Sequence, residues 1–130
     1  MKGVWEPKPT HIKPDWQLLK PLLDRAWPDA NELTQLNDIA RGHIQRWIAL
    51  PEAQWQECLD PLDTEQLKHF MQLFTLAEQH LPNCHAGAES AVIHAFKRYR
   101  TLAGQADPEL IKWLRQQTDN RFIPYGSANL

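Results

Sequence analysis

The most apolar long segment of the chain is DTEQLKHFMQLFTLAEQHL, residues 63–81. At 100° per residue, its apolar side chains cover more than half of the helical circumference. They are Leu67, Phe70, Met71, Leu73, Phe74, Leu76, Ala77 and Leu81. An ordinary surface helix carries an apolar stripe of about 100° or slightly more. We therefore expect this helix to be covered on several sides and to form the centre of the fold.

Both ends of this segment carry helix boundary signals. Asp63 and Gln66 have the spacing of a capping box, in which two side chains satisfy backbone N–H groups at a helix start. Pro82 disfavours a helical conformation at the residue before it, which makes Leu81 the expected last residue. These signals predict a central helix at residues 64–81.

Five further segments have helical spacing or helix-start signals. They are residues 15–27, 29–49 and 51–60, a segment that follows the loop 83–87 and ends before Gly104, and residues 108–117. Pro21 lies inside the first of them and should kink the helix or divide it. No run alternates between apolar and polar residues as a half-buried strand does. The connections are short, as is usual between antiparallel helices.

These elements predict a single all-α domain, a compact bundle of five to six helices with its helical core at residues 15–117. Residues 1–14 contain three prolines and are expected to form an extended arm. Residues 118–130 lack a helical period but contain three large apolar side chains. We expect this irregular tail to pack into a groove on its own domain.

Composition places the chain among ordinary globular proteins. It has 130 residues, the length of one domain, with 42% hydrophobic and 23% charged residues. The opening MKGVWEPKPT has no apolar secretory segment, and no apolar run approaches the roughly 20 residues of a membrane span. Two cysteines, Cys58 and Cys84, are too few for a disulfide framework. The sequence therefore predicts a cytoplasmic protein with reduced thiols and no membrane partner.

The net charge of −2 conceals an uneven distribution along the chain. Residues 1–28 contain five Lys or Arg and three Asp or Glu, and residues 29–90 contain three and ten. Residues 91–130 contain six and three. The three parts therefore carry charges of +2, −7 and +3. This layout could attract a charged partner or hold two copies together; alternatively, the basic ends fold back over the acidic middle.

The first candidate site lies around the end of the central helix. His80, Cys84 and His85 supply two imidazoles and a thiol, which are zinc-type ligands, although the spacing matches no common zinc motif. Alternatively, His80 complements the negative end of the helix dipole and Cys84 is a small buried apolar residue. Cys84 beside His85 also suggests a thiol activated by an imidazole. His94 or Glu89 would have to complete a metal site from the next helix.

Glu78 is the least expected residue of the central helix, because it falls inside the apolar arc between Leu67 and Met71. A carboxylate in that position has to be paired or to have a raised pKa. One interpretation is a catalytic acid, with Glu78, Cys84 and His85 as the candidate catalytic residues. The simpler interpretation is that Glu78 reaches solvent or meets an arginine from the following helix.

The second candidate site is a basic helix face near the C-terminus. The candidate binding residues are Lys97, Arg98, Arg100, Lys112 and Arg115. Such a face could contact nucleic-acid phosphates. However, the pI near 6.3 and the absence of a helix-turn-helix or zinc-finger pattern argue against a dedicated nucleic-acid-binding protein. The simpler interpretation is a basic face that is solvated or paired within the domain.

We find no glycine-rich phosphate loop, no G-x-S-x-G and no H-E-x-x-H motif in the sequence. No cofactor is therefore predicted. The leading hypothesis is a non-enzymatic protein–protein interaction or regulatory module that binds a protein partner or a second copy of itself. The alternative is association with nucleic acid through the basic helix face. A third hypothesis is a metal- or thiol-dependent enzyme at residues 78–89.

Overall fold

The structure, a computed structural model, describes residues 16–82, 84–105 and 107–126. These residues form six α-helices, two 3-10 helices and no strand, which confirms the all-α prediction. The elements are α1 (Trp16–Leu23), η1 (Ala30–Gln35), α2 (Asp38–Ile48), α3 (Glu52–Leu59), α4 (Thr64–His80), η2 (Gly87–Glu89), α5 (Ala91–Ala103) and α6 (Pro108–Gln117). The predicted arm, residues 1–14, and the last tail residues, 127–130, lie outside the described part.

Helix α4 is held at its start by the predicted capping box. The Oδ1 atom of Asp63 accepts a hydrogen bond from the Gln66 backbone N–H at 2.8 Å. The Oε1 atom of Gln66 accepts one in return from the Asp63 N–H at 3.1 Å. The helix ends at His80, and Leu81 follows with extended backbone angles because Pro82 comes next.

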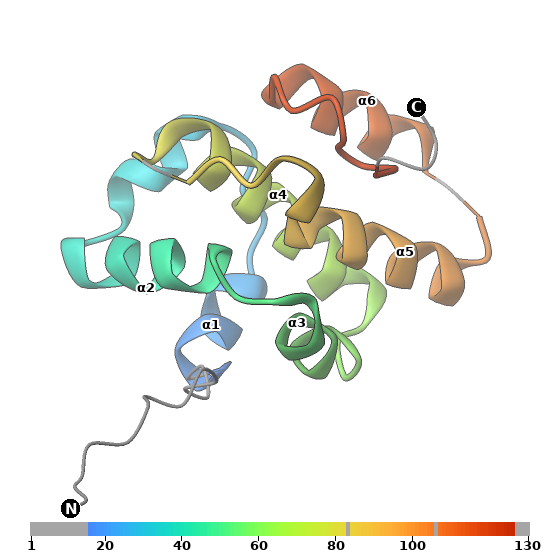
Figure 1. The fold of residues 1–130 in the computed structure, drawn as a ribbon, viewed down its shortest axis with the longest axis horizontal. Coiled ribbons are helices and arrows are strands. Elements are labelled where there is room, and N and C mark those ends of the chain that lie inside the picture. Colours follow the sequence, from blue (N-terminus) through green and yellow to red (C-terminus); the bar gives the residue numbers. More distant parts are fainter. Residues whose placement is uncertain (1–15, 83, 106, 127–130) are drawn as a thin grey trace, which may run out of the picture.

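As predicted, α4 is the central helix. It contacts α1, α2, α5, α6 and η1. Figure 1 shows α4 and α5 crossing the middle of the molecule, with α6 on one side and α1, α2 and α3 on the other. Because α4 meets partners on several sides, its wide apolar arc is buried from Leu67 to Ala77.

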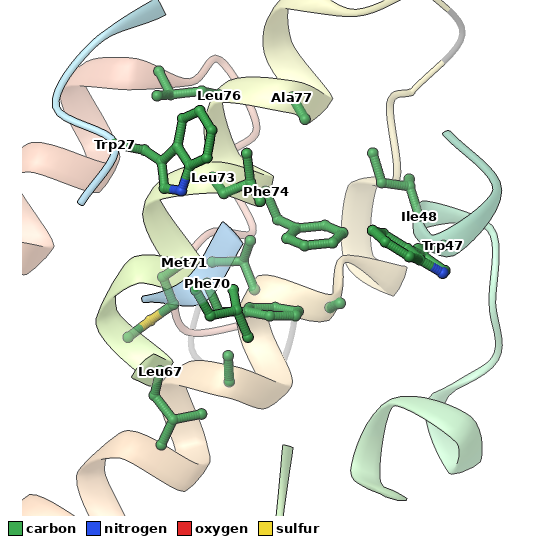
Figure 2. Packing of buried hydrophobic residues seen from close by; sticks show 14 of the residues in the cluster. Trp27, Trp47, Ile48, Leu67, Phe70, Met71, Leu73, Phe74, Leu76 and Ala77 are labelled. Atoms are coloured by element: carbon green, nitrogen blue, oxygen red, sulfur yellow. The ribbon is translucent and has the colours of Figure 1, made fainter. Parts of the chain in front are cut away.

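The core is rich in aromatic rings. Phe70 and Phe74 stack one turn apart on α4, with ring centroids 4.3 Å apart. The ring of Trp55, on α3, meets both edge-on at 5.2 Å. Figure 2 shows Phe70 and Phe74 projecting from α4 toward Trp47, while Trp27 lies on another side of the helix. These rings bury large apolar areas and dominate the packing energy.

The polar positions of α4 attach other segments to it. Gln72 accepts a hydrogen bond from the Trp27 backbone N–H at 2.9 Å. The Lys68 ammonium lies 3.9 Å from the carboxylate of Asp107, the residue that caps α6. Gln79 binds the segment that follows α6. The polar strip of α4 therefore joins connecting segments to the central helix.

The predicted helix at residues 29–49 is wrong as one element, because the chain breaks between η1 and α2. Leu36 is extended, and the Asn37 side chain accepts a hydrogen bond from the Ala40 N–H at 2.8 Å, starting a new helix. Asparagine competes with a continuous helix in this way because it favours cap positions. Asp29 caps the 3-10 turn, and Glu32 pairs with Arg25 and so does not complete a capping box.

Helix α1 contains Pro21 and is not divided by it. It is shorter than predicted, however, and ends at Leu23. Pro21 has no N–H to donate to the carbonyl four residues earlier, so the last turn is weakened. The Asp24 N–H bonds back to the Pro21 carbonyl at 3.3 Å, and the chain then leaves the helix toward Trp27.

The signals around α5 and α6 behave as predicted. Gly104 follows α5 with φ = 82°, the left-handed conformation that glycine adopts without steric cost. Asp107 caps α6 through its side chain, and Pro108 is the first helical residue. After α6 the chain turns back over the molecule, and Ile123 is buried against the core.

Candidate functional site

Glu78 is a buried carboxyl group in the last turns of α4, with only 2% of the residue exposed. Its Oε2 atom accepts a hydrogen bond from the Ser90 hydroxyl at 2.6 Å. Among the described residues, no donor or acceptor meets its Oε1 atom. The expectation that Glu78 reaches solvent or meets an arginine is therefore wrong, because the loop before α5 presents Ser90 to it.

Burial raises the pKa of Glu78 to about 8, because a charged carboxylate loses solvation inside the protein. The hydrogen bond from Ser90 favours the charged form and partly opposes this effect. Glu78 is therefore mainly protonated at neutral pH. Ser90 has a second role, since its Oγ atom accepts the Val92 N–H at 3.1 Å and caps α5.

A cavity of about 270 Å³ lies beside Glu78. Its walls come from the end of α4, the segment 85–87 and the segment 118–122. His85, Asp119 and Arg121 line it together with Glu78. The cavity therefore combines one buried carboxyl group with three side chains that can carry charge.

Hydrogen bonds of two amide side chains, Gln79 and Asn120, hold the segment 118–122 in place as one wall of this cavity. Gln79 accepts hydrogen bonds from the Thr118 hydroxyl at 3.2 Å and the Asp119 N–H at 3.0 Å. Its amide nitrogen donates to the Asp119 carboxylate at 3.1 Å. Asn120 donates to the carbonyl of Gly87 at 2.9 Å. These contacts fix an irregular segment against α4 without a helix or strand.

The structure separates the residues of the first candidate site. Glu78 and His85 line the same cavity, whereas His80 lines a different one, of about 540 Å³, together with Asp38 and Arg41. Cys84 is buried, and its thiol donates to the carbonyl of Pro82 at 3.4 Å. In the described part of the chain, no three His, Cys, Asp or Glu side chains gather in a way that could hold a metal ion.

The Cys84 thiol lies in surroundings that favour its protonated form. Burial raises the pKa of this thiol, and the nearby Glu78 carboxylate raises it further. A nucleophilic cysteine needs the opposite shift, since the thiolate is the reactive species. The Cys84–His85 pair therefore has none of the electrostatics of an activated thiol.

Arg98 differs from the other candidate binding residues because its side chain joins α5 to the end of α3. Its guanidinium donates to the carbonyl of Asp60 at 3.1 Å, and Asp60 is the C-terminal cap of α3. A cation near the last carbonyls of a helix also complements the helix dipole. Arg98 is half-buried, whereas Lys97, Arg100 and Arg115 are exposed.

The tail brings two of the predicted binding residues to one aromatic pair. The rings of Phe96, on α5, and Tyr125 meet edge-on with centroids 5.4 Å apart. The Arg100 guanidinium lies 5.7 Å from the Phe96 ring, and that of Arg115, on α6, lies 5.4 Å from the Tyr125 ring. We call Phe96, Arg100, Arg115 and Tyr125 the arginine–aromatic cluster. Lys112 instead lines a separate cavity with Lys68 and Asp107.

The basic residues of the C-terminal third make no ion pair with a carboxylate within the described ranges. They are Lys97, Arg98, Arg100, Lys112, Arg115 and Arg121. Among the described residues, basic side chains of this third contact the acidic middle through the hydrogen bond of Arg98 with the Asp60 carbonyl and through His94, which lies 3.7 Å from Glu52. Near the N-terminus, Arg25 pairs with Glu32. At this point a basic end of the chain does contact the acidic middle, as the alternative interpretation predicted.

Sequence reasoning missed several residues that build these sites. Ser90 directly precedes the apolar positions of α5, so the sequence could have indicated that it caps this helix. Its contact with Glu78 could not be predicted from the sequence. Gln79 and Asn120 looked like ordinary surface amides. Their roles depend on the path of the tail, for which the sequence holds no periodic signal.

The chain matches no protein-family model, no curated protein and no solved structure. None of the described helices combines the length and apolar character that crossing a bilayer requires. Evidence on function therefore comes from the chain's own charges, cavities and contacts.

Proposed function

We propose that the protein is a non-enzymatic interaction module that binds an acidic protein partner through the arginine–aromatic cluster. The observation that carries this proposal is the absence of carboxylate partners for the C-terminal Lys and Arg residues in the described part of the chain. Exposed cations without an internal carboxylate partner remain available to an external anionic group.

The chemistry of the cluster favours protein recognition. An arginine guanidinium is a planar fork that can bind a carboxylate through two parallel hydrogen bonds. Arg100 and Arg115 are each placed against a ring, which restricts their side chains before a partner arrives. Arginine and tyrosine are also enriched among residues that dominate binding energy at protein interfaces.

An acidic protein fits this surface better than a nucleic acid does. Arg98 donates to the carbonyl of Asp60, so one of the five predicted binding residues is already engaged within the domain. Asp107, Glu109 and Asp119 lie in the same third of the chain and would repel a long phosphate backbone. The net charge of −2 likewise lacks the excess of positive charge typical of a nucleic-acid-binding domain.

A double charge reversal tests the proposal. A poly-glutamate peptide serves as the probe for an acidic protein, and duplex DNA and single-stranded RNA serve as probes for nucleic acid. We expect wild type to bind poly-glutamate at low salt and the Arg100→Glu/Arg115→Glu variant to bind at least about tenfold more weakly. The control is Lys20→Glu/Arg46→Glu, an equal charge change on exposed positions of α1 and α2.

Thermal unfolding of each variant separates lost binding from lost structure. Equal weakening by the control variant would mean that only total charge matters, and the cluster would have no specific role. Tighter binding of either nucleic acid than of poly-glutamate would replace the protein partner with a nucleic acid. If none of the three probes binds at low salt, the proposal fails.

A further inference from the structure

A buried carboxyl group normally has a charged or hydrogen-bonding partner for each oxygen. Glu78 has one for Oε2 only, from the neutral hydroxyl of Ser90. No Lys, Arg or His in the described residues forms an ion pair with Glu78. The Oε1 atom therefore lacks a hydrogen-bond partner among the described residues, and the adjoining cavity has room for a group that could supply one.

The walls of the cavity indicate what kind of molecule could supply that group. Ala86 and Phe122 give it apolar surface, and Asp119 adds a second carboxylate. The volume of about 270 Å³ is slightly below the range of drug-sized ligand pockets. These features suit a short apolar chain with a single charged head.

We propose that this cavity binds a small primary alkylamine, whose ammonium group pairs with Glu78. The ammonium donates to Oε1, and the alkyl chain packs against Ala86 and Phe122. Because Oε1 is buried, the lining of the cavity must shift for the ammonium group to reach it. This proposal is independent of the arginine–aromatic cluster and of the acidic partner.

Arg121 limits which amines fit. Its guanidinium lies 5.2 Å from the centre of the ring of its neighbour Phe122, the residue is exposed, and it makes no ion pair with a described carboxylate. A second ammonium group on the ligand would meet this cation. We therefore expect a monoamine to bind more tightly than a diamine of equal length.

Binding is coupled to the release of one proton from Glu78. The protonated carboxyl group and the ammonium ion become a carboxylate–ammonium pair, and the proton passes to the buffer. Since the pKa of Glu78 is raised to about 8, affinity should increase about tenfold per pH unit below that value and level off above it. Primary alkylamines keep their own charge below about pH 10, as the lysine side chain does.

Other groups near Glu78 can contribute to a pH dependence and need separate tests. Cys84 is close enough for its pKa to be affected by Glu78. His85, Asp119 and Arg121 line the cavity itself. Replacing His85 with Asn should leave the tenfold slope intact if Glu78 is the group that titrates, whereas Glu78→Gln should remove it.

Calorimetric titration with n-butylammonium chloride provides the experiment. We expect saturable binding by wild type at pH 8.5, with about one proton released per amine bound at pH 7 in buffers of different ionisation enthalpy. The Glu78→Gln variant should bind at least about tenfold more weakly at pH 8.5. The matched control is Glu89→Gln, which removes an exposed carboxylate close by in sequence and should change neither affinity nor slope.

Sodium butyrate and 1-butanol, with the same chain and different heads, complete the experiment. Tighter binding of butyrate, accompanied by proton uptake, would overturn the proposal and assign the cavity to anions through Arg121. Binding of butanol equal to that of butylammonium would show an apolar site only. No saturable heat with wild type at pH 8.5 would also overturn the proposal, whatever the variants do.

Discussion

Glu78 shows how one side chain can set the pH response of a small helical protein. In the folded state its pKa is raised to about 8, against an ordinary value of 4.5. Between these two values the folded chain holds a proton that the unfolded chain releases. Stability from this group is therefore complete below about pH 4.5 and decreases as the pH rises through 8.

The Glu78→Gln variant should remove this pH dependence, because glutamine keeps the shape of the side chain and cannot ionise. We expect the free energy of unfolding of the variant, relative to wild type, to increase by on the order of 4 kcal/mol from about pH 4.5 to about pH 8.5. Urea denaturation at both pH values measures it. Parallel behaviour of variant and wild type across this range would show that Glu78 ionises normally in the folded state.

The sequence predicts the apolar environment of Glu78 but not its hydrogen-bond partner. The helical wheel placed it among apolar neighbours, which indicated an abnormal environment. The wheel could not indicate the partner, because Ser90 is twelve residues away and beyond a loop. The same limit applied to His80 and His85, which are close in sequence but line different cavities.

At the scale of elements, α4 organises the molecule with its polar side chains as well as with its apolar ones. Gln72 holds the chain after α1, Lys68 holds the cap of α6, and Gln79 holds the tail. A helix that is apolar over most of its circumference could pack in several rotational settings. These polar contacts distinguish one setting from the others, because they are satisfied only when α1, α6 and the tail have their observed positions.

The start of α4 depends on its capping box, so replacing Asp63 should weaken the whole fold. We expect Asp63→Ala to lower the free energy of unfolding by about 1 kcal/mol, because the Gln66 N–H loses its acceptor. Asp63→Asn keeps an oxygen at that position and should cost less than half as much. Chemical denaturation of the three proteins decides this, and equal losses in both variants would mean that the charge, not the cap, stabilises α4.

Helix boundaries were predictable where a cap or breaker left one choice. Asp63 with Gln66, Gly104, and Asp107 with Pro108 all mark ends that the structure has. The prediction was wrong at residues 29–49, where the apolar spacing continues but Asn37 starts a second helix. A residue such as Asn37 inside a periodic segment does not show from the sequence alone whether a new helix starts there. Its side chain can cap a helix only where the backbone leaves the helical conformation.

At the scale of the whole molecule, the segment after α6 connects both candidate sites. Residues 118–122 form a wall of the Glu78 cavity, and Tyr125 completes the arginine–aromatic cluster. Ile123 lies between them and is 1% exposed. The presence of apolar residues predicted that this segment packs on the domain, but its path depends on contacts between distant parts of the chain.

Ile123 should therefore act as the anchor of the tail. We expect Ile123→Ala to lower the free energy of unfolding by about 2–4 kcal/mol, through lost burial and the cavity left behind. The matched control is Ile39→Ala, because Ile39 is 71% exposed and its loss should change stability by less than about 0.5 kcal/mol. Equal effects of the two substitutions in urea denaturation would mean that the tail does not contribute to the core.

The two buried thiols give the molecule built-in reporters of its own opening. Cys58 belongs to α3, where burial raises its pKa to about 12, and Cys84 lies close enough to Glu78 for that carboxylate to affect the pKa of the thiol. A thiol-directed reagent can modify either one only when its surroundings open. The ratio of the two modification rates therefore distinguishes breathing of the region around α3 from breathing of the wall beside Glu78, without the introduction of any label.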